Sequence, residues 1–424
     1  MHRPSDIPRL LMIAQACYPP QAPEAAVNAK LVLAMRAAGW EVDVISRSNS
    51  GEVYPPSQSD PWAPVAQVTH SLYAEVSRSL PNTLRKIRGA LRTGHVTHGL
   101  VWVDAAISLG MKLCRERHYD CILSRSSPYF GHLPALVIKR RTGLPWIANW
   151  NDPDPIEKYP PPYGQGPDAR ISPLTTRYFN AVSASADWHT FPSERLRRYC
   201  AGYLGNGVGE KSSVIPHVAI QRVGALPDRS AIMHFCHAGT VTAPRDPKPL
   251  LMGIKHFIDQ HPDAAREVAF KFIGTVPKDM GEFSAKLGIS QIVQILGTLG
   301  YEETQRTLES EDVFVIVEAP MAEGIFLPSK FVDAIQLGKP IFAVSPREGT
   351  LADVLNSRGG GIAVDCTRPD EIARGLAQLH LAWKSGQLSS YSSQQIESLY
   401  SEEFVLNEYR KLFKMLTNRT AARS

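Results

Sequence analysis

The sequence contains few cysteines, and their positions exclude several kinds of site. Six cysteines occur in 424 residues, and none forms a Cys-x-x-Cys pair or lies near a histidine at the spacing of zinc ligands. This pattern argues against a structural zinc site and against a disulfide framework. It fits reduced thiols in a cytosolic protein, and we expect no bound metal.

Long hydrophobic runs are also missing. The stretch at 10–16 is too short for the core of a signal peptide or for a spanning helix, and no other stretch is long and apolar enough to cross a bilayer. The net charge of +5 favours anionic ligands or an anionic surface without requiring nucleic acid. We therefore expect a cytoplasmic protein that is soluble, or peripheral at the inner face of the membrane, with no nucleic-acid partner.

The chain has enough apolar material for more than one core, since 43% of its residues are hydrophobic. Apolar runs of strand length, such as EVDVIS, FKFIG and DVFVIV, alternate with segments of helical period. This alternation predicts an α/β fold with two doubly wound, Rossmann-like domains facing each other across a cleft. We place the domains at 1–215 and 231–395, with a connector at 216–230 and a C-terminal helix at 396–424 that packs back toward the first domain. Ligands of such sheets gather at the carboxyl ends of the strands.

The stretch EGIFLPSKFVDAIQLGKPIFAV contains a candidate phosphate site. Pro328 suits the first turn of a helix, and Ser329 and Lys330 then lie where free backbone N–H groups favour an anion. Asp333, one turn further on, is placed to accept hydrogen bonds from ribose hydroxyls. The alternative is that Lys330 and Asp333 form an ordinary solvated pair on a helix face.

A second candidate is the loop in HAGTVTAPRDPKPLL. Gly239 allows a close backbone approach to a ligand, and Arg245 and Lys248 lie in a proline-rich turn before the next helix. Two cations at this point would neutralise a diphosphate leaving group. The alternative is an exposed basic turn.

The order and spacing of AGTVTAPRDPKPLL, FKFIG, IVQILGTLGYEET, EDVFVIV and LPSKFVDAIQLGKPIFAV resemble the donor domain of GT-B glycosyltransferases, in particular the retaining family 4 of bacterial glycan biosynthesis. YPPQAPEAAVNAKLVLAMRAAGWEVDVIS, RRTGLPWIANWNDPDP and ADWHTFPSERLRRY are similar to segments of that family's first domain. The resemblance implies hexosyl transfer from a UDP-sugar or GDP-sugar to a glycan, lipid-linked or other acceptor, with retention and with no cofactor besides the donor.

The resemblance also assigns residues in the second half. Arg245 stands where the family has its diphosphate-binding basic residue, and Lys330 belongs to a Pro-Ser-Lys variant. Asp333 replaces the second acid of the Glu-x7-Glu motif, and Ile325 occupies the place of the first, so Glu323 is the candidate substitute. The remaining residues that we expect at the donor are Gly239, Thr240, Lys248, Gly274 and Ser329. In the first half, Ala25 and Ala26 stand where the family has paired glycines.

Two residues of the first half join Glu323 as catalytic candidates. His132 opens a helix, and Asp152 lies in the loop after a strand, both at places where cleft residues are expected. A histidine at a helix start is also typical of a cap or a core partner. Asp152 and Asp154 form an Asp-x-Asp, but the flanking prolines favour a rigid turn over a metal site.

One basic amphipathic segment suggests a membrane partner. Leu84, Ile87 and Leu91 recur at helical spacing among cations from Arg85 to Arg92. Such a segment is able to lie on an anionic membrane surface, where lipid-linked acceptors are found. The alternative is a solvated helix packed on its own domain. Two other functions also remain open: a GT-B epimerase of nucleotide sugars, and a non-catalytic subunit that binds nucleotide.

Overall fold

The computed structural model describes residues 7–20, 22–48, 60–73, 79–205, 207–220 and 231–421. The chain divides into two units. The first comprises Met1–Tyr159, Gly164–Val218 and Glu402–Ser424, and the second comprises Pro160–Tyr163 and Ala219–Ser401. The second unit thus extends to Ser401, beyond the predicted limit of 395. Residues 221–230 of the predicted connector lie outside the described residues.

The first unit is built on a parallel sheet of seven strands in the order β3-β2-β1-β4-β5-β6-β7. Its central strands are buried on both faces, which explains why they are continuous apolar runs in the sequence. The strands are β1 Arg9–Ala14, β2 Glu41–Ser48, β3 Thr69–Tyr73, β4 Cys121–Arg125, β5 Trp146–Asn149, β6 Trp188–Phe191 and β7 Ser212–Val214.

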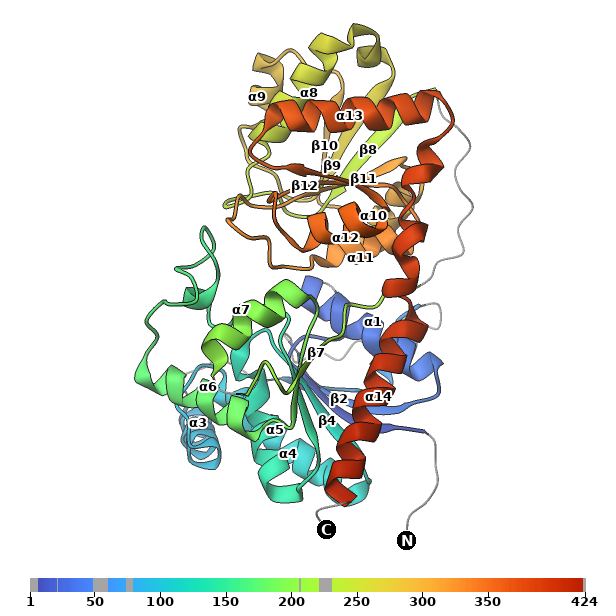
Figure 1. Cartoon of the computed structure of the whole chain (residues 1–424). Helices are drawn as coiled ribbons and strands as arrows, with labels where there is room; N and C mark the ends of the chain where they lie inside the picture. The colour runs from blue at the N-terminus through green and yellow to red at the C-terminus, as the bar shows by residue number, and fades with distance from the viewer. Residues whose placement is uncertain are drawn as a thin grey trace. The chain divides into compact units, whose positions relative to one another are not determined.

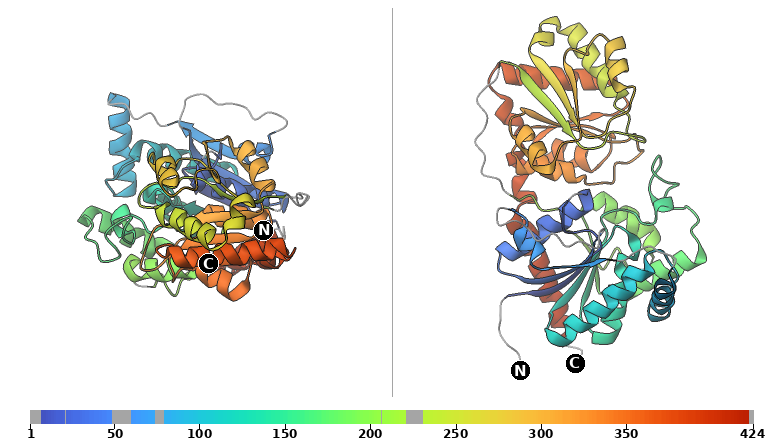
Figure 2. Two further views of the ribbon diagram at one scale, coloured as in Figure 1. Left: turned by 90° about the horizontal axis from the view of Figure 1, so that it is seen from above. Right: turned by 180° about the vertical axis from the view of Figure 1, so that it is seen from behind.

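Helices cover this sheet, and several of them pack against one another. The chain-terminal α14 packs on α1, α4 packs on α5, and α6 packs on α5 and α7. Figures 1 and 2 show α3 at the periphery of this unit, beside α4. The helices are α1 Pro23–Ala37, α2 Ala63–Ala66, α3 Leu80–Thr93, α4 Leu100–Glu116, α5 His132–Thr142, α6 Pro173–Ser185, α7 Glu194–Leu204 and α14 Glu402–Ala421.

The second unit repeats the design with six parallel strands in the order β10-β9-β8-β11-β12-β13. Helices α8, α9 and α13 lie on one face of the sheet, and α10, α11 and α12 lie on the other (Figure 1). The strands are β8 Met233–Ala238, β9 Val268–Ile273, β10 Val293–Gly297, β11 Val313–Val317, β12 Ile341–Ser345 and β13 Gly361–Asp365. The helices are α8 Lys248–Gln260, α9 Met280–Lys286, α10 Tyr301–Glu309, α11 Ser329–Gln336, α12 Thr350–Arg358 and α13 Pro369–Lys384.

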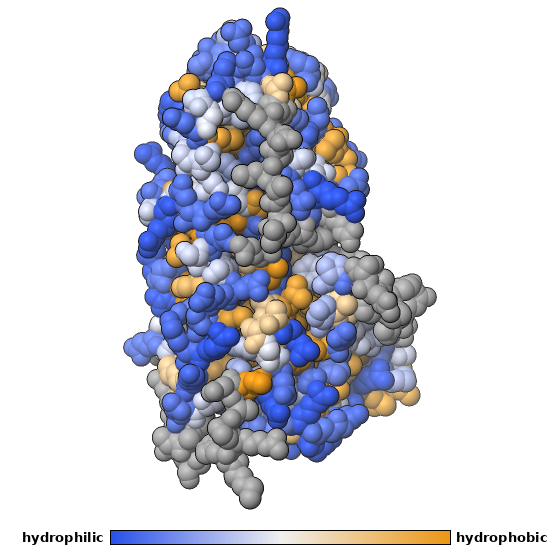
Figure 3. Space-filling model, turned by 90° about the vertical axis from the view of Figure 1, so that its right-hand side faces the viewer, coloured by the Kyte–Doolittle hydropathy of each residue, from blue (hydrophilic) through white to orange (hydrophobic). Residues whose placement is uncertain are grey.

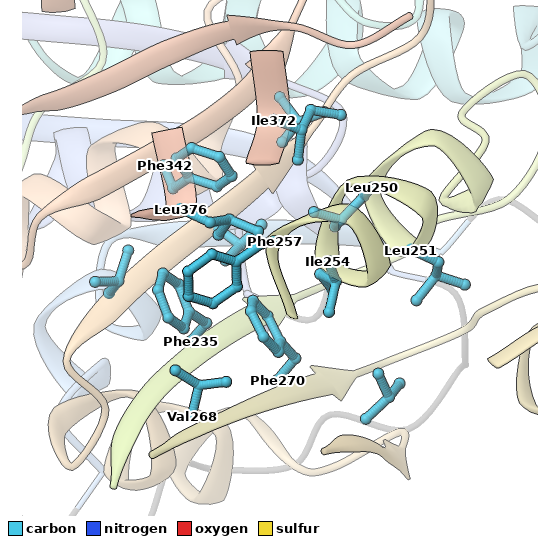
Figure 4. Packing of buried hydrophobic residues seen from close by; sticks show 14 of the residues in the cluster. Phe235, Leu250, Leu251, Ile254, Phe257, Val268, Phe270, Phe342, Ile372 and Leu376 are labelled. Atoms are coloured by element: carbon cyan, nitrogen blue, oxygen red, sulfur yellow. The ribbon is translucent and has the colours of Figure 1, made fainter. Parts of the chain in front are cut away.

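Aromatic rings form the centre of the second unit's core. Phe257 of α8 points at Phe235 and Phe270 of the sheet (Figure 4), and the latter two rings stack with their centroids 4.7 Å apart. All three side chains are buried. Such a close-packed core holds β8 and α8 in a defined relation, and the loop between them is therefore anchored at both ends.

The predicted α/β fold with two doubly wound sheets is confirmed, and the long elements lie where the alternation of apolar runs and helical segments predicted them. The sequence analysis missed short or weakly patterned elements, such as β3, β7 and α6. Three residues, as in β7, are too few to establish a period. Within the described residues, no helix combines the length and the apolar character needed to cross a membrane.

Candidate functional site

The loops after β8 and β9 meet at two glycines in the second unit. Gly239 has a φ of +121° and Gly274 a φ of +108°, a region that L side chains rarely adopt. A Cβ on Gly274 would lie 2.5 Å from the carbonyl oxygen of Gly239, and a Cβ on Gly239 would lie 2.6 Å from Cε of Lys330. The glycines therefore let two strand ends and one lysine pack within van der Waals contact.

Lys330 reaches from the first turn of α11 to the end of β8. Its Nζ lies 3.3 Å from Nε2 of His237 and 3.5 Å from the carbonyl oxygen of Thr240. Burial, reinforced by the nearby charge of Arg245, lowers the pKa of Lys330 to about 8. The ammonium is therefore charged at neutral pH but only weakly stabilised by its surroundings, which favours the approach of an anion.

His237 positions this lysine through a hydrogen bond. The imidazole is buried, and its Nδ1 lies 2.9 Å from the carbonyl oxygen of Val315. Because a carbonyl only accepts, Nδ1 carries the proton and Nε2 is left to accept a hydrogen bond from Lys330. Burial, together with the charge of Lys330, holds the pKa of His237 well below its usual range, so the ring stays neutral and positions the lysine.

Arg245 forms an ion pair with an acid that the sequence analysis did not identify. Its Nε lies 3.4 Å from Oε1 of Glu318, which directly follows β11 and is 4% exposed. Within the described part of the chain neither carboxylate oxygen of Glu318 has a hydrogen bond. Arg245 therefore neutralises a buried charge. The available signal was the acid at the end of the apolar run DVFVIV, since such strand ends gather ligand-facing residues.

The start of α11 has the form expected of an anion site. Pro328 precedes the helix in extended conformation, and in the described part of the chain no side chain caps the first turn, where Ser329 and Lys330 lie. The first backbone N–H groups of a helix have no intrahelical acceptor, and they carry the positive end of its dipole. Asp333 is half-buried one turn later, where its charge acts on Lys330.

Lys248, predicted at the donor, and Glu323, predicted as a catalytic residue, have different surroundings. Lys248 opens α8 and pairs with Asp279 at 2.9 Å, and its Nζ lies 5.6 Å from the centroid of the Phe283 ring. Glu323 is half-buried in the loop after β11, whereas Ile325 is completely buried. A backbone hydrogen bond connects the loop after β11 to the loop after β12: the N–H of Thr350 donates to the carbonyl oxygen of Gly324 at 2.7 Å.

His132 in the first unit lies in the core rather than at a surface. Its ring is fully buried, its Nδ1 lies 2.7 Å from Oγ of Ser124, and its centroid is 4.4 Å from that of Trp150. Burial lowers the pKa of His132 to about 3. The imidazole is thus neutral and packed in the core of the first unit.

Asp152 lies among other acids at the carboxyl end of the first unit's sheet. It follows β5, and its charge raises the pKa of both Glu24 and Asp154. Asp154 is 5% exposed, and burial is the main reason that its pKa is well above the usual range. Sequence reasoning had not identified Glu24. In the described part of the chain, no group of three or more histidine, cysteine, aspartate or glutamate side chains is placed to hold a metal ion.

Comparison with known proteins agrees with this architecture. Residues 25–216 match the family model of the glycosyl transferase 4-like domain. No curated protein matches the sequence significantly.

Several solved structures match nearly the whole chain. Sucrose-phosphate synthase from Thermosynechococcus elongatus is 12% identical with a TM-score of 0.65, and the match covers 97% of this chain and 100% of that one. A glycosyltransferase from Rickettsia africae is 10% identical with a TM-score of 0.65, over 97% and 99% of the two chains. HepE from Anabaena, in complex with UDP, is 12% identical with a TM-score of 0.66, over 96% and 100%.

At such low identity these structural matches establish the fold alone. They extend over both units, and the family model covers most of the first. Together they confirm the resemblance that the sequence motifs suggested: residues 25–216 match the glycosyl transferase 4-like domain, and the chain has the GT-B fold of these solved structures.

Proposed function

We propose that the chain transfers a hexosyl group from a nucleoside diphosphate sugar to a hydroxyl of a glycan or lipid-linked acceptor, with retention of the anomeric configuration. The observation that carries this proposal is the position of Lys330, whose ammonium lies at the uncapped start of α11 against the glycine loop after β8. The departing diphosphate develops negative charge in the transition state, and a preorganised cation stabilises that charge.

In this arrangement, each part of the nucleotide that carries the sugar has a protein group to bind it. The first N–H groups of α11 and Ser329 bind a phosphate, Lys330 and Arg245 neutralise the diphosphate, and Asp333 binds the ribose hydroxyls. Because two cations serve the diphosphate, we propose that transfer needs neither a divalent metal nor another cofactor. HepE was solved with UDP and with UDP-glucose, so UDP is the first nucleotide to test and GDP the second.

The sugar itself needs a carboxylate that the family motif would place at Ile325. This side chain is completely buried and apolar, so it offers no hydrogen bond to a sugar. We propose that Glu323, half-buried in the same loop, takes that role. The pinning of this loop to the start of α12 limits its movement and favours a fixed position for the carboxylate.

Calorimetry with UDP and GDP tests the donor site, and release of UDP from UDP-glucose or UDP-galactose in the presence of methyl glycosides tests transfer. We expect binding without added metal and turnover unaffected by EDTA. The anomeric proton signal of the product reports retention or inversion. A new sugar formed without any acceptor would identify an epimerase, and nucleotide binding with no turnover would identify a non-catalytic subunit. Absence of UDP and GDP binding would contradict the donor site.

We further propose that α3 brings the protein to an anionic membrane surface at the inner face of the membrane. Four apolar side chains at spacings of four, three and four residues are exposed on it: Leu80 (73%), Leu84 (59%), Ile87 (51%) and Leu91 (79%). The opposite face is docked, because a Cβ on Gly89 would lie 2.8 Å from the carbonyl oxygen of Leu100, and Arg88 and Arg92 pair with the buried Asp104.

This arrangement fits a lipid surface better than ordinary solvent exposure. The cations Arg85 and Lys86 are exposed beside the apolar stripe, as in helices that lie at the boundary between headgroups and acyl chains. By contrast, the face shown in Figure 3 is mostly hydrophilic, with hydrophobic residues in small scattered groups.

Cosedimentation with vesicles tests the membrane surface. We expect binding to phosphatidylcholine vesicles that contain phosphatidylglycerol, and weaker binding to phosphatidylcholine alone. Replacing Leu84 and Leu91 by Gln should weaken binding at least about tenfold, since two exposed leucines would no longer enter the membrane. Leu381→Gln is the matched control, because this leucine of α13 is also 69% exposed. Equal loss in both variants would contradict the assignment.

A further inference from the structure

A small cavity in the second unit lies at the carboxyl ends of β11 and β12. Its volume is about 10 Å³, which is room for about one group the size of a water molecule. Two buried polar side chains line it: Glu318 directly follows β11, and Ser345 is the last residue of β12. Within the described residues, the Oγ of Ser345 and both carboxylate oxygens of Glu318 are without a hydrogen bond. The cavity therefore offers hydrogen bonds to a single small group.

The walls of this cavity are fixed by the backbone. Gly324 and Gly349 form an isolated parallel bridge, and a Cβ on Gly349 would lie 3.0 Å from the Cα of Gly324. Thr350 also lines the cavity, but its Oγ1 donates to the carbonyl oxygen of Ile325 at 3.2 Å. The cavity thus keeps its shape through contacts of its own walls, and the two buried polar side chains remain to bind a ligand.

The chemistry of the surroundings selects a neutral hydroxyl as the occupant. An ionised carboxylate only accepts hydrogen bonds, whereas the hydroxyl of Ser345 is able to donate one. A ligand hydroxyl fits both groups, because it donates to Glu318 and accepts from Ser345. The charge of Glu318 disfavours an anion, and the nearby cations Arg245 and Lys330 disfavour an ammonium.

The same cations connect the cavity with the diphosphate. The Nε of Arg245 lies 3.4 Å from Oε1 of Glu318, and the charges of both residues act on Lys330. A hexose is bonded directly to the diphosphate that these cations would hold, so its hydroxyls lie close to the phosphate oxygens. A hydroxyl of the sugar is therefore within reach of the cavity.

We propose that Glu318 binds one hydroxyl of the transferred hexose and so selects the donor sugar, which rests on the proposed function. Ser345 donates to the oxygen of the same hydroxyl, and Glu318 acts in addition to Glu323. The substrate class is a donor whose hexose carries a hydroxyl at that position. A deoxy sugar is rejected, because it leaves a buried carboxylate without a hydrogen-bond donor.

Deoxy analogues of the donor test this selection without any acceptor. Calorimetry measures the Kd of UDP, of UDP-glucose and of UDP-galactose. It then measures the Kd of the 2-deoxy, 3-deoxy, 4-deoxy and 6-deoxy analogues of the sugar nucleotide that binds more tightly. In the wild type, we expect one analogue to bind about 100-fold more weakly than its parent, since a hydrogen bond to a charged group is lost.

The substitution Glu318→Gln keeps the shape of the side chain and removes its charge. The loss caused by that one analogue should shrink to about tenfold or less, because hydrogen bonds between neutral groups are weaker. UDP itself should bind this variant at least as tightly as the wild type, because Arg245 loses its counter-charge. A merely structural role of Glu318 would instead weaken the binding of UDP and of every sugar nucleotide alike.

Two further variants frame the result. Ser345→Ala should also reduce the discrimination, but less than Glu318→Gln, because the carboxylate remains. Glu282→Gln is the control, since this glutamate is exposed on α9 and should leave the discrimination unchanged.

Two outcomes would overturn the inference. One is a wild type that binds every deoxy analogue within tenfold of its parent, which would mean that only a buried water occupies the cavity. The other is a Glu318→Gln variant that discriminates as the wild type does. Failure of the proposed function itself looks different, because the wild type would then bind neither UDP nor GDP.

Discussion

The two sheets of this protein share a topology but carry opposite charge patterns at their carboxyl ends. In the second unit a buried acid, Glu318, is accompanied by Arg245 and Lys330. In the first unit a buried cation, Arg125, is linked through two amides to Glu24, with Asp152 nearby. The fold therefore provides the same kind of strand end twice, and the side chains placed there determine its charge pattern.

The comparison also shows two ways of holding a charged group. Lys330 is positioned by a neutral imidazole and a carbonyl, which leaves its charge available to a ligand. Glu24 is positioned by amides that are themselves oriented by a cation. In both cases neutral groups hold the charged side chain.

Removing the ammonium of Lys330 should have the largest effect. Lys330→Met keeps the apolar stem and should weaken UDP binding about 100-fold, or ~2.7 kcal/mol, and lower turnover further. In the wild type, UDP affinity should fall as the pH rises through about 8, because Lys330 loses its proton there. Calorimetry between pH 6.5 and 9.5 measures both. Lys286→Met is the control, and the proposal fails if the two variants bind UDP alike.

A side chain at Gly239 should displace the ammonium of Lys330 without removing its charge. Gly239→Ala places a Cβ 2.6 Å from Cε of Lys330 and forces alanine into a φ of +121°. UDP affinity should fall about tenfold, since the ammonium has to move while its charge remains. Gly288→Ala also adopts a positive φ, but its Cβ meets open space. Calorimetry on the two variants separates displacement of Lys330 from backbone strain.

Breaking the ion pair in the second unit should lower stability as well as activity. Arg245→Ala leaves the buried Glu318 without its cation, which should cost ~1–3 kcal/mol. Adding Glu318→Gln should restore much of this stability but not UDP binding. Thermal unfolding of the single and double variants measures the recovery. If the double variant is as unstable as the single one, the pair does not account for the loss.

The smallest effect should come from an acid in the first unit. The raised pKa of Asp154 means that the folded state holds its proton more tightly than the unfolded state. Its contribution to stability is therefore fully present at low pH, and it is lost as the pH rises from the usual aspartate range toward the raised value. Asp154→Asn should raise stability by about 1 kcal/mol at pH 8 and by less at pH 5. Thermal midpoints at both pH values, with the exposed Asp168→Asn as control, decide this.

Local sequence pattern was sufficient to predict a helix start beside Pro328 and the long strands. A proline before Ser329, and apolar runs such as β11, indicate structure through properties of neighbouring residues. Local pattern did not predict the burial of His132. A histidine at a helix start resembled a cleft residue, but the register of α5 on the sheet turns its ring toward Ser124 and Trp150.

The sequence by itself determined the fold class and the two-unit organisation, because strand burial and helical period are written in residues close together along the chain. Only the tertiary structure decided which charges meet. Arg125 and Asn28 are 97 positions apart, and Lys330 and His237 are 93 apart. Lys248, three residues from Arg245, turns instead to Asp279. The order of strands in a parallel sheet brings distant loop ends together, and sequence spacing carries no record of that order.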